Sequence, residues 1–94
     1  MSSHYVLKIQ YPDGRPAETR KLDMAVAVIG RDSGDIALGD SQASGRHAEL
    51  RFSNGRLTVK DAGSTNGTFY KGARTVNFQV GPGESFTIGQ TILT

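Results

Sequence analysis

Apolar side chains recur at every second position through much of this chain, most clearly in residues 5–9 and 48–52. Successive side chains of a β-strand point to opposite faces, so a period of two predicts strands that bury one face. Short segments containing glycine separate these runs, and glycine makes up 12 of the 94 residues. The pattern predicts about ten short strands and no helix, which is typical of an all-β sandwich or barrel.

The predicted strands and turns can be placed along the chain. Strands are expected at residues 5–10, 18–22, 25–29, 35–38, 47–52, 57–60, 69–70, 76–80, 84–88 and 90–94. The segment 18–22 is polar enough for a sheet edge, and 25–29 reads as a buried strand. Pro12-Asp13-Gly14 and Lys71-Gly72 are turn signals, and Asn54-Gly55 is the strongest short signal for a hairpin.

The length and charge of the chain limit its organisation and its partners. A sequence of 94 residues predicts one domain, 1–94. The chain stops two residues after Ile92, inside a predicted strand, so we expect it to be part of a larger protein. Eleven basic and nine acidic residues give a net charge of +2. This charge is too small to indicate a nucleic-acid or membrane partner, and we expect a monomer that binds neither.

Several kinds of chemistry lack the residues they need. The sequence has no cysteine, which excludes disulfides, thiolate nucleophiles and cysteine-ligated metals. It has two histidines, no metal-ligand spacing, no Walker motif and no Gly-x-Ser-x-Gly elbow. We therefore expect a binding module without catalytic residues, metal or cofactor. Residues 1–4 do not begin a secretory signal, so a cytoplasmic location is expected.

Three predicted loops carry the polar residues that suit a phosphate on a peptide. They are Gly30-Arg31, then Ser44-Gly45-Arg46-His47, and then Gly63-Ser64-Thr65-Asn66-Gly67-Thr68. Loops at one end of a sandwich converge and often carry function. An arginine offers a fork to phosphate oxygens, a hydroxyl offers a short donor, and an asparagine pairs with the N–H and C=O of an extended chain.

These motifs, in this order and spacing, resemble the forkhead-associated (FHA) domain from about Tyr5 onward. The residues that carry the resemblance are Gly30-Arg31, Ser44-x-x-His47, Asp61-x-Gly63-Ser64-Thr65-Asn66-Gly67-Thr68-Phe69 and Gly81-x-Gly83-Glu84-x-Phe86-x-Ile88-Gly89. The resemblance implies an antiparallel β-sandwich of the FHA/SMAD-like type, with about eleven strands and binding loops at one end. It also implies recognition of phosphothreonine in a partner protein, as an adaptor in kinase signalling.

The resemblance assigns roles to individual residues. Arg31 and Ser44 match residues that bind the phosphate, and Thr65 and Asn66 match residues that meet the peptide. Three others match residues that support the loops, namely Gly30, His47 and Gly67. For His47, the residues alone favour a buried histidine over a direct ligand.

One position departs from the family pattern and leaves other functions open. Gly45 stands where the family commonly has a basic or polar residue that reaches the phosphate, and strand alternation turns the next residue, Arg46, the other way. A module of the same fold that binds an unphosphorylated partner is therefore an alternative. A small nucleic-acid binder is a third hypothesis, although the basic residues are dispersed along the sequence.

The residues around the predicted site receive weaker assignments. Gln42 is neutral and gives no reason to prefer an acidic residue in the partner. Tyr70 and Lys71 are expected to flank the site. The remaining basic residues are expected to be solvated surface charges, namely Arg46, Arg51, Arg56, Lys60 and Arg74.

Overall fold

A computed structural model describes residues 5–94 and contains eleven strands and no helix within them. Of the two histidines, His4 lies outside the described residues. The strands are β1 (Tyr5–Gln10), β2 (Glu18–Leu22), β3 (Val26–Gly30), β4 (Ile36–Ala37), β5 (Ala48–Ser53), β6 (Arg56–Asp61), β7 (Thr68–Tyr70), β8 (Ala73–Arg74), β9 (Asn77–Val80), β10 (Phe86–Ile88) and β11 (Thr91–Leu93). Nothing in residues 5–94 forms a helix long and apolar enough to span a membrane.

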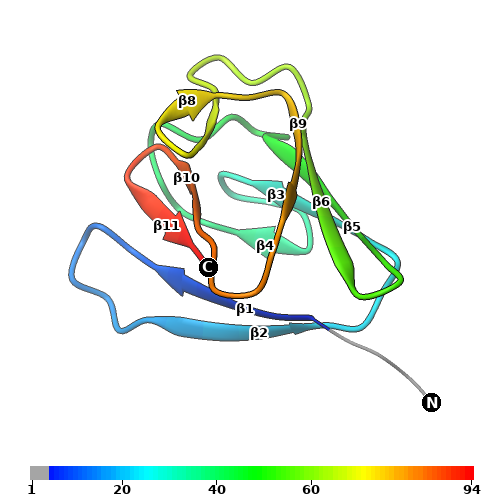
Figure 1. The fold of residues 1–94 in the computed structure, drawn as a ribbon. Helices are drawn as coiled ribbons and strands as arrows, with labels where there is room; N and C mark the ends of the chain where they lie inside the picture. The colour runs from blue at the N-terminus through cyan, green and yellow to red at the C-terminus, as the bar shows by residue number, and fades with distance from the viewer. Residues whose placement is uncertain (1–4) are drawn as a thin grey trace.

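The strands form two sheets that pack face to face, as a sandwich (Figure 1). One sheet has the order β2-β1-β11-β10-β7-β8 and the other has the order β4-β3-β5-β6-β9. Neighbouring strands run antiparallel, except that β4 lies parallel to β3, with Ile29 opposite Ile36. The predicted sandwich is confirmed, and this parallel pair is one feature that the sequence pattern did not indicate.

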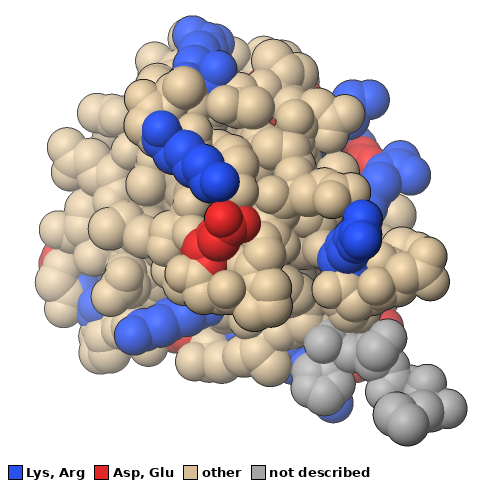
Figure 2. All heavy atoms as spheres, in the orientation of Figure 1, with Lys and Arg blue, Asp and Glu red and all other residues tan. Residues whose placement is uncertain are grey.

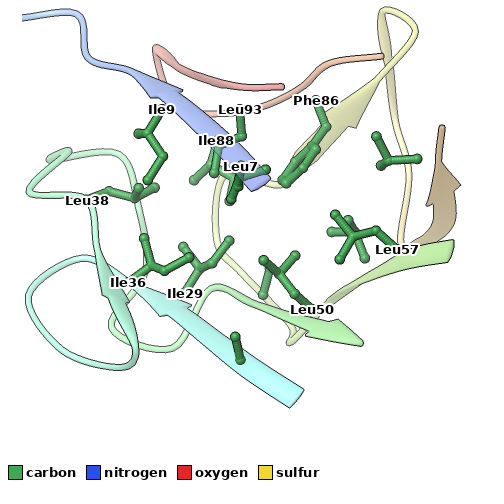
Figure 3. Packing of buried hydrophobic residues seen from close by; sticks show 14 of the residues in the cluster. Leu7, Ile9, Ile29, Ile36, Leu38, Leu50, Leu57, Phe86, Ile88 and Leu93 are labelled. Carbon is green, nitrogen blue, oxygen red and sulfur yellow. The ribbon is translucent and has the colours of Figure 1, made fainter. Parts of the chain in front are cut away.

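The alternation of apolar residues is explained by the core between the sheets. Side chains from both sheets point toward one another, as Figure 3 shows for Leu7, Ile29, Leu50, Phe86 and Ile88. All five are at most 1% exposed. Each buried side chain of this size stabilises the fold by about 1.5–3 kcal/mol. This core holds the strand ends, and therefore the loops between them, in fixed positions.

Two predicted tight turns have the backbone geometry that their residues favour. Ser53 pairs with Arg56 across β5 and β6, so the connecting loop is Asn54-Gly55. Both loop residues have positive φ, 55° and 76°, as a type I′ hairpin requires. Lys71-Gly72 makes the same turn between β7 and β8, with φ of 53° and 80°. The two-residue strand β8 that follows was not predicted, because two residues carry no detectable period.

The structure tests the predicted sheet position of β2 and the predicted burial of β3. β2 lies at the edge of its sheet, as its polar sequence predicted. β3 was predicted as a buried strand, but it buries only one face. Ala27 and Ile29 face the core, whereas Val26, on the opposite face of the strand, is 40% exposed. The outer face of the second sheet is therefore open to solvent along β3.

Candidate functional site

The three predicted loops meet at one end of the sandwich and form an open hollow. We call it the loop hollow and define it by its lining residues, Arg31, Ser41, Gln42, Ala43, Ser44, Gly45, Thr65 and Asn66. The connections β3–β4, β4–β5 and β6–β7 supply these residues. The four residues predicted to meet the phosphopeptide lie in this lining, and so does Gly45, the site position that departs from the family pattern. The sequence did not predict the places of Ser41 and Ala43.

The backbone of Arg31 is fixed while its side chain stays accessible. Its N–H donates to the carbonyl of Ser44 at 3.0 Å, and its own carbonyl accepts from the N–H of Gly39 at 2.7 Å. The guanidinium Nε pairs with Asp32 at 3.0 Å, but the two side chains are 49% and 76% exposed. Such exposed pairs contribute little and exchange readily. Arg31 therefore presents a cation to the loop hollow.

Gly30 permits two loops to approach each other closely. A Cβ atom at this position would lie 2.1 Å from the carbonyl oxygen of Gly45 and 2.5 Å from that of Ser33. Both distances are far inside van der Waals contact, so any side chain would push the β4–β5 loop away. Glycine is needed here because no side chain fits between the two loops, and not because the backbone has a positive φ.

Two hydrogen bonds join the β4–β5 loop to the β6–β7 loop across the loop hollow. The N–H of Thr65 donates to Ser44 Oγ at 3.0 Å, and Asn66 Nδ2 donates to the carbonyl of Gln42 at 2.9 Å. The Ser44 hydroxyl therefore keeps its own hydrogen for another acceptor, and the Asn66 carboxamide keeps its oxygen and one N–H for a peptide backbone.

His47 lies beneath these loops and is fully buried. Its Nδ1 accepts a hydrogen bond of 3.0 Å from the N–H of Ser44, which assigns the ring hydrogen to Nε2. Nε2 in turn donates to the carbonyl of Gly67 at 3.0 Å. The ring thus links the two loops from below and does not line the loop hollow.

Asp61 organises the β6–β7 loop, and sequence reasoning gave it no role. Its Oδ1 accepts from the N–H groups of Gly63 and Ser64, and its Oδ2 accepts from the hydroxyls of Ser64 and Thr68. Burial by itself raises the pKa of Asp61, but the hydrogen bonds from Ser64, Thr68 and Gly63 outweigh it and hold that pKa below its usual value. The Asp-x-Gly-Ser sequence of an Asx turn was the signal that could have indicated this role.

Arg74 is exposed, as predicted for a solvated surface charge. It also braces the same loop from the outside, a role that the sequence did not predict. Its Nη2 donates to the carbonyl of Ser64 at 3.2 Å and lies 3.4 Å from that of Thr65. Gly67 has a φ of 90°, and a Cβ atom there would meet Arg74 Nε at 2.6 Å. The arginine packs on this glycine because the β7–β8 hairpin folds back beside the loop.

Asp40 supports the opposite wall of the loop hollow. This buried carboxylate accepts from the N–H of Gln42 at 2.9 Å, from the N–H of Gln90 at 3.0 Å and from the Thr91 hydroxyl at 2.8 Å. Burial opposes ionisation, but the hydrogen bonds from Gln42, Thr91 and Gln90 hold the pKa of Asp40 below its usual value. The segment that carries Gln42 is thereby tied to β11.

Three residues that the sequence placed in or beside the predicted site do not line the loop hollow. Arg46 points away from the loop hollow, as strand alternation predicted, and its Nη2 pairs with Glu49 at 3.3 Å. Tyr70 and Lys71 do not line the loop hollow either, in contrast to their predicted flanking position. Both contact Glu84, with the Tyr70 hydroxyl donating at 2.8 Å. Among residues 5–94 no group of three or more histidine, aspartate or glutamate side chains is placed to hold a metal ion.

Comparison with known proteins gives the family. The sequence model of the FHA domain matches residues 27–89. The chain belongs to the FHA domain family. FhaB of Mycolicibacterium smegmatis, an FHA domain-containing protein, is 36% identical over 93 residues, which are 96% of this chain and 60% of FhaB. The glycogen accumulation regulator GarA of Mycobacterium tuberculosis is 47% identical over 49 residues, which are 51% of this chain and 30% of GarA.

The fold of this FHA domain also matches a solved relative. A structure from an analysis of phosphothreonine-dependent FHA domain interactions superposes with a TM-score of 0.80 and 28% identity, covering 95% of this chain and 93% of that one. The predicted family and the predicted sandwich are both confirmed. The matched part of the chain spans 30% of the length of GarA and 60% of that of FhaB.

Proposed function

We propose that this FHA domain recognises phosphothreonine in partner proteins and catalyses no reaction. The observation that carries the proposal is the loop hollow, because it brings Arg31, Ser44, Thr65 and Asn66 together at one end of a rigid sandwich. The solved relative at 28% identity was studied for phosphothreonine-dependent interactions, which supports the same ligand here.

Each residue of the loop hollow has a chemical role in this proposal. A phosphothreonine carries a charge of about −1.5 to −2 at neutral pH and three strong acceptor oxygens. Arg31 supplies a cation with forked donors, and the free hydrogen of the Ser44 hydroxyl supplies a short donor. The Asn66 carboxamide binds the peptide backbone next to the phosphothreonine, and Thr65 forms the adjoining wall.

The expected affinity follows from how few charged donors the loop hollow contains. Arg31 is the one cation in its lining within residues 5–94. We expect micromolar binding, about −7 to −8 kcal/mol. A phosphoserine peptide should bind more weakly, because seating the threonine methyl group contributes roughly 1–3 kcal/mol.

The broader role of the protein also belongs to this proposal. We propose an adaptor in kinase signalling, because GarA, a relative, is named a regulator rather than an enzyme. The proposed adaptor acts as a monomer. Its cytoplasmic location stays a prediction from the sequence.

A phosphothreonine peptide library tests the function directly. The library is degenerate around the phosphothreonine, and selected peptides are compared with their unphosphorylated and phosphoserine twins by isothermal titration calorimetry. Clear preference for phosphothreonine supports the proposal.

Gly45 favours a second candidate, an FHA domain that binds an unphosphorylated partner, because glycine has no side chain that could donate to a phosphate in the loop hollow. Equal affinity for the phosphorylated and unphosphorylated twins would establish that second candidate instead.

A further inference from the structure

The outer face of the five-stranded sheet collects basic residues that lie apart in the sequence. Strand register places alternate side chains of β3, β5, β6 and β9 on this face. Arg46 precedes β5 and is included because it forms an ion pair with Glu49. We call this surface the basic face and define it as Val26, Val28, Arg46, Glu49, Arg51, Ser53, Arg56, Thr58, Lys60, Asn77 and Gln79. Figure 2 shows blue side chains along the side of the molecule that β5, β6 and β9 form in Figure 1, with little red among them.

The arrangement of these charges opposes stability in the free protein. Arg51 lies directly opposite Thr58, so Arg56 and Lys60 are its two diagonal neighbours on β6. Diagonal neighbours on one sheet face are within reach of long side chains, and like charges so placed repel. Glu49 lies directly opposite Lys60 and offsets part of this repulsion, whereas Arg56 lies opposite the uncharged Ser53.

Glu49 neutralises only part of this charge. Its two carboxylate oxygens pair with Arg51 at 2.7 Å and with Arg46 at 3.3 Å. Within residues 5–94, no acidic side chain lies at salt-bridge distance from Arg56 or Lys60. The basic face therefore has an excess of positive charge that is open to an external anion.

The basic face is also hollowed, and the hollow is lined by hydrogen-bond donors. Its lining residues are Arg51, Ser53, Asn54, Arg56, Thr58 and Gln79. Each of these side chains offers an N–H or O–H group, and the two arginines offer forks that match a carboxylate. This hollow lies at the β5–β6 hairpin, and it shares no residue with the loop hollow.

We propose that the basic face binds an acidic segment of a partner protein, rich in aspartate or glutamate. Charge complementarity and the donor-lined hollow indicate an anionic ligand. A nucleic acid fits less well, because the basic face has no aromatic side chain on which bases could stack. A membrane fits less well, because Val26 is its one strongly exposed apolar side chain.

The test uses a ligand that carries no phosphate, so its outcome is independent of the proposed phosphothreonine function. The ¹⁵N-labelled chain is titrated with a hexaglutamate peptide at low ionic strength, and amide shifts are followed by NMR. We expect weak binding, with a Kd of about 1 mM, and shifts centred on Arg51, Arg56, Thr58 and Gln79. The same shifts should persist in Arg31→Ala, which removes the cation of the loop hollow.

A charge-matched pair of double variants makes the test specific. Arg51→Gln with Arg56→Gln should weaken hexaglutamate binding about three- to tenfold. The control, Lys8→Gln with Lys21→Gln, removes the same charge from exposed positions on the other sheet and should change little. The dispersion of the NMR spectrum verifies that each variant is folded.

Three results would overturn the proposal. The first is a shift map confined to the residues of the loop hollow. The second is equal weakening by both double variants, which would reduce the effect to net charge. The third is tighter binding of a hexathymidylate or of phosphatidylserine vesicles than of hexaglutamate, because the preferred partner would then be a nucleic acid or a membrane.

Discussion

The N–H of Thr65 donates to Ser44 Oγ at 3.0 Å and joins two loops that lie 21 positions apart in the sequence. With His47 beneath them, the two loops behave as one supported unit rather than as separate flexible segments. Substitutions should therefore fall into two groups. One group removes a contact with the ligand, and the other disturbs the support under the loops.

Arg31→Ala belongs to the first group. It should reduce phosphothreonine-peptide binding to near the limit of detection, because it removes the cation of the loop hollow. The melting temperature should change little, since the exposed pair with Asp32 contributes little to stability. Calorimetric titration and a thermal melt on the same sample check this. An unfolded Arg31→Ala variant would assign the residue a structural role instead.

His47→Ala belongs to the second group. It leaves the N–H of Ser44 and the carbonyl of Gly67 without partners in a buried place. Such losses amount to about 1–3 kcal/mol, which for a domain of this size lowers the melting temperature by about 5–20 °C. Peptide affinity should fall as well, through loop disorder. A His47→Ala variant with an unchanged melting temperature contradicts this account of the loops.

Arg74→Met tests the brace that the sequence did not reveal. Methionine keeps much of the side-chain length but removes the donors to the carbonyls of Ser64 and Thr65. We expect peptide affinity to fall about three- to tenfold, corresponding to one net hydrogen bond, with a small change in melting temperature. Lys21→Met, which removes an exposed positive charge from β2, is the control and should bind the peptide normally. Equal effects of the two substitutions would mean that Arg74 acts only through its charge.

Sequence reasoning identified most strands, the hairpin turns and most residues of the loop hollow, although not Ser41 and Ala43. These features are encoded locally, by a period of two or by residues such as Asn54 and Gly55 that tolerate positive φ. Arg74 was missed because its contacts depend on how the β7–β8 hairpin folds back over Gly67. The basic face was missed for a similar reason, since only the register of β5 against β6 brings Arg51 near Lys60.

The pH dependence of stability should reveal Asp61. Burial raises the pKa of Asp61, but the hydrogen bonds that Ser64, Thr68 and Gly63 donate to its carboxylate outweigh burial and hold that pKa below the ordinary 3.8. The folded state therefore favours the carboxylate. Its contribution is fully present above the unfolded pKa and is lost as the pH falls through the lower folded pKa.

Urea unfolding of the wild type, of Asp61→Asn and of a control measures this contribution. The wild-type free energy of unfolding should fall as the pH drops below about 4. Asp61→Asn should be less stable at neutral pH and should show a shallower fall in acid. Asp32→Asn removes an exposed carboxylate and serves as the control. If Asp61→Asn and wild type show parallel pH profiles, the carboxylate does not stabilise the loop in the way described.

Gly45 is the position where the loop hollow can be improved. Its φ lies outside the left-handed region, and a Cβ atom built on it has no neighbouring atom within 4 Å. A Cβ atom here therefore meets neither backbone strain nor a steric clash. Its neighbour Gly30 differs, because any side chain there would strike the Gly45 carbonyl.

Gly45→Arg should tighten phosphothreonine-peptide binding about two- to fivefold. A charge-assisted hydrogen bond contributes roughly 1.5–3 kcal/mol, and ordering a long side chain offsets up to about 2 kcal/mol of it. The gain should be absent for the unphosphorylated peptide and should shrink at high salt, since the new interaction is an exposed charge pair. Gly45→Ala adds a Cβ without charge and should bind like wild type. Weaker binding by both variants, with unchanged melting temperatures, would show that Gly45 admits the peptide because it is small.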